Sequence, residues 1–151
     1  MQTRFNERNA ELAPKGQWLA YESDESGRSE IYVRPFPDVE SGRWQVSTSG
    51  GRTPVWARSG DELFYVAPDG TIQGVRVDGA STWRSSTPTT VVQGDYVLPA
   101  EALRGRTFDI APDGRRFLMI KAGGGDAARD PNRLIVVEHW FEELQRLVPS
   151  N

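Results

Sequence analysis

The segment APKGQWLAY at residues 13–21 decides the fold, because it recurs twice further along the chain. Its copies are ARSGDELFY at 57–65 and APDGRRFLM at 111–119, so the offsets are 44 residues and then 54. A propeller blade repeats about every 40–45 residues, and the first offset falls in that range. The second offset predicts an insertion, which we place at residues 96–106.

Each copy combines a tight turn with an apolar strand. Pro112 and Gly114 suit a hairpin turn, since proline presets φ and glycine accepts a positive φ. The residues after the turn form continuous apolar runs, such as LFYV at 63–66 and FLMI at 117–120. Such runs are typical of strands with two buried faces, and a central blade strand between neighbouring blades fits them.

Further strands, rich in β-branched and aromatic residues, complete each unit. The first unit predicts strands at 30–36 and 43–48, the second at 71–77 and 89–93, and the third only at 134–138. The predicted fold is therefore all-β. It is a single domain over 1–151, a partial propeller of three four-stranded antiparallel blades at 10–51, 52–95 and 107–138.

The end of the chain predicts a short amphipathic helix at residues 139–148. Its apolar residues recur at helical spacing on one face and include Trp140, Phe141, Leu144 and Leu147. This face either packs against the β-sheets or docks a partner.

These segments resemble the TolB-like class of β-propeller repeats, whose turn is typically Ser-Pro-Asp-Gly. APDG at 111–114 and EIYV at 30–33 match that pattern, and ARSG at 57–60 is a looser copy. YVRPFP at 32–37 and WFEEL at 140–144 are similar to the last blades of propellers appended to bacterial serine/threonine kinases. The resemblance implies the fold and says little about function. Relatives of this kind carry six or more blades.

Three blades are too few to close a ring, since closed propellers have about 4–8. Two copies related by a two-fold axis would close a six-bladed ring, which predicts a homodimer. The candidate assembly residues are Phe5 and the apolar helix face of Trp140, Phe141, Leu144 and Leu147. Residues 3–8 are a candidate for the missing outer strand of the third blade, in the same chain or a neighbouring one. The alternative is a piece of a longer propeller.

Composition excludes several kinds of chemistry. The 151 residues include no cysteine, which excludes thiolate catalysis and Cys-ligated zinc, and His139 is the single histidine. The net charge is −3 without a block of like charges, and no apolar run reaches about 18 residues, so we expect neither nucleic-acid nor membrane binding. No motif calls for a cofactor. We expect a cytoplasmic protein if the chain is complete, and an extracytoplasmic one if it belongs to a longer exported protein.

Arginine supplies 16 of the 18 basic residues, and its guanidinium group suits anionic ligands. Arg52, Arg58, Arg104 and Arg106 lie near predicted innermost strands or the insertion. They are the candidate channel site for a small anion or a protein partner, although compositional bias accounts for the count equally well. The carboxylates near turns, which include Asp24, Glu25, Glu30, Asp61, Glu62, Asp109 and Asp113, lack the spacing of a calcium loop and are expected at solvated tips.

The sequence thus favours a non-catalytic binding or scaffolding module. The alternative is enzymatic. Such a chain would be an accessory propeller of a hydrolase, or a metal-dependent propeller hydrolase whose carboxylates converge on the axis.

Overall fold

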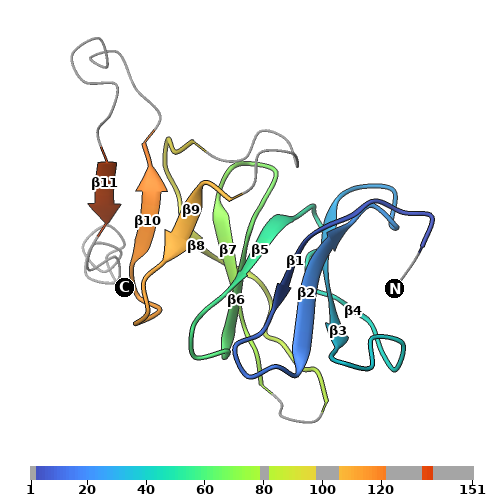
Figure 1. The fold of residues 1–151 in the computed structure, drawn as a ribbon. Coiled ribbons are helices and arrows are strands. Elements are labelled where there is room, and N and C mark those ends of the chain that lie inside the picture. Colours follow the sequence, from blue (N-terminus) through green and yellow to red (C-terminus); the bar gives the residue numbers. More distant parts are fainter. Residues whose placement is uncertain (1–2, 79–81, 98–105, 122–133, 138–151) are drawn as a thin grey trace, which may run out of the picture.

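The structure, a computed structural model, describes residues 3–78, 82–97, 106–121 and 134–137 (Figure 1). These ranges contain eleven strands in three antiparallel sheets and no helix. The sheets follow one another along the chain: β1 (Glu7–Leu12), β2 (Trp18–Ser23), β3 (Glu30–Pro35) and β4 (Trp44–Gln45); β5 (Arg52–Trp56), β6 (Glu62–Val66), β7 (Ile72–Arg76) and β8 (Thr89–Val92); and β9 (Phe108–Ile110), β10 (Phe117–Ile120) and β11 (Leu134–Val137). The prediction of an all-β chain built of blade-like antiparallel sheets is confirmed. We call the sheets blades 1, 2 and 3.

The repeated turn has the same geometry in all three blades. Gly16, Gly60 and Gly114 have φ values of 76°, 73° and 70°, the left-handed region that glycine enters without a Cβ clash. Each glycine N–H donates to the carbonyl of the alanine three residues earlier, at 2.7 to 2.9 Å. The turn therefore joins β1 to β2, β5 to β6 and β9 to β10 in one repeated conformation.

The first strands of blades 1 and 2 share a bulge. The pairing register shifts between Arg8 and Glu11 in β1, and between Arg52 and Val55 in β5. Within these bulges Asn9 and Thr53, 44 residues apart, take φ values of 50° and 52°. The repeat is thus preserved even where the backbone is irregular.

Two apolar cores lie between the blades. The first, between blades 1 and 2, contains Trp18, Trp56 and Trp83, and Trp44 packs against it. Trp83 lies in a loop of the chain yet is buried and meets Trp18 edge to face, with ring centroids 5.5 Å apart. The second core joins blades 2 and 3 and is built from Phe64, Phe117, Met119 and aliphatic side chains.

The structure corrects three expectations. Glu7 and Arg8 belong to β1 and pair with Ser23 and Glu22, so residues 3–8 do not form an outer strand of blade 3. The apolar run of β10 does not have two buried faces, because its residues alternate between buried and exposed. Glu30 does not lie at a solvated tip, since it is fully buried. The predicted helix at 139–148, with Trp140, Phe141, Leu144 and Leu147, lies outside the described residues.

Candidate functional site

The first strand of each blade, β1, β5 and β9, is an edge strand of its sheet. In a propeller these strands surround the central axis. Each has an exposed arginine at or just before its start, five residues before the alanine of the turn: Arg8, Arg52 and Arg106. Arg8 and Arg52 also pair in equivalent register, opposite Glu22 and Val66. Each blade therefore has one exposed arginine at the same position of the repeat, at or near the start of its first strand.

Glu11, on β1, contacts β5 and the residues just before β9. Its carboxylate accepts the backbone N–H of Trp56 at 3.2 Å and the Arg106 guanidinium at 3.1 Å, and its carbonyl accepts the Trp56 indole N–H at 3.1 Å. Arg106 also pairs with Asp109 at 3.2 Å. Burial raises the pKa of Glu11 above its usual range, against the opposing effects of the Trp56 N–H and Arg106. This contact spans 95 residues of sequence.

The four arginines predicted as a channel site do not gather in one place. Arg52 and Arg106 occupy equivalent positions of the repeat, whereas Arg58 is exposed in the β5–β6 turn, beyond the opposite end of β5. Arg104 lies outside the described residues. Sequence reasoning missed Arg8 and Glu11, although the five-residue spacing to the turn alanine identifies Arg8 once the repeats are aligned.

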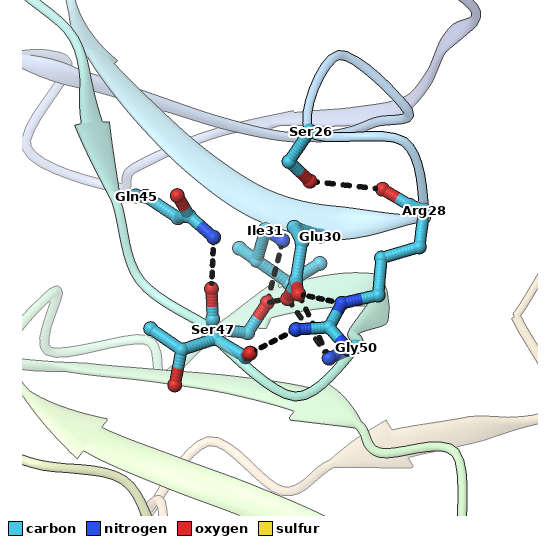
Figure 2. A network of polar contacts seen from close by, with 8 residues as sticks. Ser26, Arg28, Glu30, Ile31, Gln45, Ser47 and Gly50 are labelled. Carbon is cyan, nitrogen blue, oxygen red and sulfur yellow. Dashed lines mark hydrogen bonds and ion pairs between the residues drawn. The ribbon is translucent and has the colours of Figure 1, made fainter.

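A second polar group, buried and structural, closes the connection from blade 1 to blade 2 (Figure 2). The Glu30 carboxylate accepts hydrogen bonds from Arg28 Nε at 2.7 Å, from the Ser47 hydroxyl, and from the Gly50 N–H at 3.0 Å. Ser47 in turn accepts the Ile31 N–H at 2.8 Å. A buried carboxylate needs such donors, and here they fix the turn that leads into β5.

Glu22 performs a similar task at the bulges of β1 and β5. It is buried, and its carboxylate accepts Asn9 Nδ2 at 3.0 Å, the Ser29 hydroxyl at 2.5 Å and the Thr53 N–H at 3.3 Å. Asn9 and Thr53 are the two bulge residues with positive φ. The carboxylate thus ties the bulges of blades 1 and 2 together.

A pocket of about 450 Å³ opens beside the turn that leads from blade 1 into β5. It is lined by residues 48–50 and 67–69 together with Tyr65, Gln73 and Pro88. Burial, with a contribution from the charge of Glu30, raises the pKa of Tyr65 to about 12, so its hydroxyl stays neutral at physiological pH. The Asp69 carboxylate accepts the N–H and hydroxyl of Thr71, which lower the pKa of Asp69.

The outer faces of blades 1 and 3 expose apolar side chains at positions that are buried between blades elsewhere in the repeat. In blade 2, Phe64 and Val66 are buried against blade 3, but their repeat equivalents Leu118 and Ile120 are 41% and 45% exposed. On blade 1, Leu12 is 44% exposed, whereas its equivalent Trp56 is buried. On the same face of blade 1, the Tyr21 and Tyr32 rings stack at 5.8 Å, and Arg34 donates to the Tyr21 hydroxyl at 2.9 Å.

The other predicted features are dispersed. Phe5 precedes β1, is partly buried, and lies under the Arg4 guanidinium at 5.1 Å. The part of the chain that the structure describes holds no cluster of three or more potential metal ligands of the His, Cys, Asp or Glu types. Among the same residues, no helix has the length and apolar character needed to span a bilayer.

Comparison with known proteins agrees on the fold. No protein-family model and no curated protein matches the sequence. Among solved structures, a candidate TolB from Agrobacterium tumefaciens aligns with a TM-score of 0.55 and 15% identity, covering 83% of this chain and 42% of the other. The chain is structurally similar to the TolB β-propeller.

A candidate 6-phosphogluconolactonase from Bacteroides uniformis is also similar, with a TM-score of 0.52, 16% identity, and coverage of 90% of this chain and 37% of the other. TolB from Acinetobacter baumannii aligns at 13% identity and a TM-score of 0.44, covering 90% of this chain and 41% of that chain. The chain thus spans about two fifths of the length of the first two structures.

Proposed function

We propose that this TolB-like chain is a non-catalytic binding and scaffolding module that closes a six-bladed ring by homodimerisation. In that ring, blade 1 of each copy follows blade 3 of the other. A ring of this kind has no open blade face, and its axis and turns are available to a partner.

The observation that carries the proposal is the exposure of Leu118 and Ile120. The repeat buries the equivalent pair Phe64 and Val66 against the next blade, which supports the packing of another blade on the same face of blade 3. Leu12 offers an exposed apolar side chain on the opposite, preceding face of blade 1. Exposed apolar faces of this kind are typical of association surfaces.

Enzymatic action, alone or beside a hydrolase, is the rival function. It would need carboxylates that converge on the axis. Glu11 and Asp109 both lie there, and both contact Arg106. That pairing supports a role in joining blades more than one in catalysis.

Light scattering coupled to size-exclusion chromatography tests the dimer. We expect twice the 16.9 kDa chain mass at micromolar concentration. Leu118→Asp and Ile120→Asp should raise the dimer dissociation constant by at least about a hundredfold, because burial of an unpaired carboxylate costs several kcal/mol. Thr87→Asp, at an exposed residue in the loop before β8 of blade 2, away from both outer blade faces, is the matched control. A folded wild-type monomer would overturn the proposal.

A further inference from the structure

We propose that the pocket beside the turn from blade 1 into β5 binds a neutral molecule rich in hydroxyl groups, of the size of a mono- or disaccharide. This inference goes beyond the proposed function and does not depend on the ring, because described residues of a single chain line the pocket. Its volume of about 450 Å³ lies within the range of about 300–1,000 Å³ that small-molecule sites occupy.

The Tyr65 side chain supplies an unpartnered hydrogen-bonding group to this pocket. Tyr65 is 3% exposed, and its hydroxyl makes no hydrogen bond with any residue that the structure describes. Within those ranges the fully enclosed polar atoms without a partner are Trp18 Nε1 and Glu25 Oε1, so the Tyr65 oxygen still reaches the pocket that its residue lines. A buried hydroxyl without a partner is costly, and a ligand in the pocket would supply one.

Two further side chains of blade 2 bring acceptors to the pocket and are oriented by their neighbours. Gln73 Nε2 donates to the hydroxyls of Thr71 and Thr90, each at 2.8 Å, which leaves Gln73 Oε1 as an acceptor. Asp69 Oδ1 accepts the N–H and the hydroxyl of Thr71, and Asp69 Oδ2 remains available. Tyr65 and Gln73 are paired across β6 and β7, so their side chains project from the same face of the sheet.

The opposite wall is the turn of residues 48–50, which lies close against the β6–β7 turn. Gly50 has a φ of 97°, and a Cβ at this position would clash with Pro68 Cγ. Both Glu30 oxygens accept the Gly50 N–H at 3.0 Å, so the buried carboxylate holds this wall in place (Figure 2). The same turn also carries the hydroxyls of its first two residues, a threonine and a serine. The walls of the pocket are therefore formed before any ligand binds.

The charges around the pocket favour a neutral ligand. Its described lining contains no lysine or arginine, and its single carboxylate, Asp69, is ionised because the Thr71 N–H and hydroxyl lower its pKa. Behind the wall, Arg28 compensates the charge of Glu30 at 2.7 Å. An anion thus finds no counter-charge, and one exposed carboxylate contributes little to holding a cation. Sugar hydroxyls both donate and accept, so they can pair with every polar group of the lining.

A fixed panel of neutral sugars tests the site: D-glucose, D-galactose, D-mannose, maltose and lactose, titrated into the isotope-labelled full chain and followed by heteronuclear NMR. We expect at least one sugar to saturate with a dissociation constant of about 10 mM or lower, and to shift the backbone amides of residues 48–50 and 69–71. Tyr65→Phe should weaken that binding about three- to tenfold, because it removes the hydroxyl alone. Asp69→Asn should weaken it about tenfold, because hydrogen bonds to a charged acceptor are stronger.

Tyr21→Phe is the matched control. Tyr21 lies 44 residues before Tyr65, at the equivalent position of blade 1, and its hydroxyl already accepts from Arg34. This variant should leave sugar affinity unchanged. Equal weakening in Tyr21→Phe and Tyr65→Phe would overturn the assignment of the Tyr65 hydroxyl to the ligand.

The remaining outcomes separate the pocket from the ring. A dimer that no sugar of the panel saturates overturns the pocket and leaves the ring, whereas a monomer that binds a sugar supports the pocket and overturns the ring. n-Butylammonium chloride is titrated as the cationic alternative. If it saturates the site, loses affinity in Asp69→Asn and keeps its affinity in Tyr65→Phe, the neutral ligand is overturned.

Discussion

The two junctions between blades are built differently. Blades 1 and 2 meet through tryptophans and through the carboxylates of Glu11, Glu22 and Glu30, each with defined donors. Blades 2 and 3 meet through phenylalanine, methionine and aliphatic side chains. All buried polar and charged residues of the described chain fall between Glu22 and Thr71, within blades 1 and 2.

The two junctions therefore contribute differently to the packing of the blades: the apolar junction stabilises the contact, and the polar junction fixes its geometry. Apolar contact is non-directional, so the second junction tolerates changes that preserve volume. Directional hydrogen bonds to a buried carboxylate accept one geometry, so the first junction fixes how β5 leaves blade 1. The exposed face of blade 3 carries the apolar side chains Leu118 and Ile120, so it resembles the second junction more than the first.

Truncation at the apolar junction should have the largest effect. Phe64 meets Phe117 edge to face with ring centroids 5.1 Å apart, and both rings are buried. Phe64→Ala should lower the free energy of unfolding by about 3–5 kcal/mol, measured by urea denaturation, because it removes apolar contact and leaves a cavity. Phe36→Ala, at an exposed ring, is the control. A loss at Phe64 below about 1 kcal/mol would show that this junction is not close-packed.

Removal of the Glu30 carboxylate should cost slightly less, about 3 kcal/mol. Glu30→Ala leaves the Ser47 hydroxyl and the Gly50 N–H without their acceptor in a buried position. Glu40→Ala, at a largely exposed carboxylate that approaches Arg34 at 3.7 Å, should change stability little. Equal losses in the two variants, measured by urea denaturation, would contradict the claim that the first junction depends on its polar group.

The repeat in the sequence predicted much of this fold because its signal is local. The turn glycines and the apolar strands after them follow from residue type alone: β6 contains the predicted run at 63–66, and β10 coincides with the one at 117–120. The axial contact of Arg106 with Glu11 joins residues 95 positions apart, which no local pattern reveals. Burial of Glu30 was equally hidden, because two of its donors, Ser47 and Gly50, come from the segment after β4. Trp83 shows the same limit, since a loop position gave no sign that its ring completes a core.

The free energy of unfolding at alkaline pH tests whether folding favours the neutral form of the Tyr65 hydroxyl at the first junction. Burial and Glu30 raise the pKa of Tyr65 to about 12, above the usual 10, so folding favours the neutral form. Stability contributed by this group is complete below pH 10 and is lost as pH rises from 10 towards about 12. Tyr65→Phe should therefore lose less stability than wild type across that window, as measured by urea denaturation at each pH. Tyr21, whose pKa burial also raises, provides the shared background. Parallel curves for the two proteins would exclude Tyr65 as the group responsible.

The smallest effect is expected where the two turns of blades 1 and 2 meet at the surface. Lys15 Nζ lies 2.5 Å from Asp61 Oδ1, and the two side chains are 51% and 61% exposed. Solvent screens such a pair, so a double-mutant cycle with Lys15→Ala and Asp61→Ala should give a coupling of about 0.2–1 kcal/mol that falls as salt is added. Coupling that persists in high salt would mean that this pair, too, helps to orient blade 2. The specificity of the first junction would then extend from its buried carboxylates to its surface.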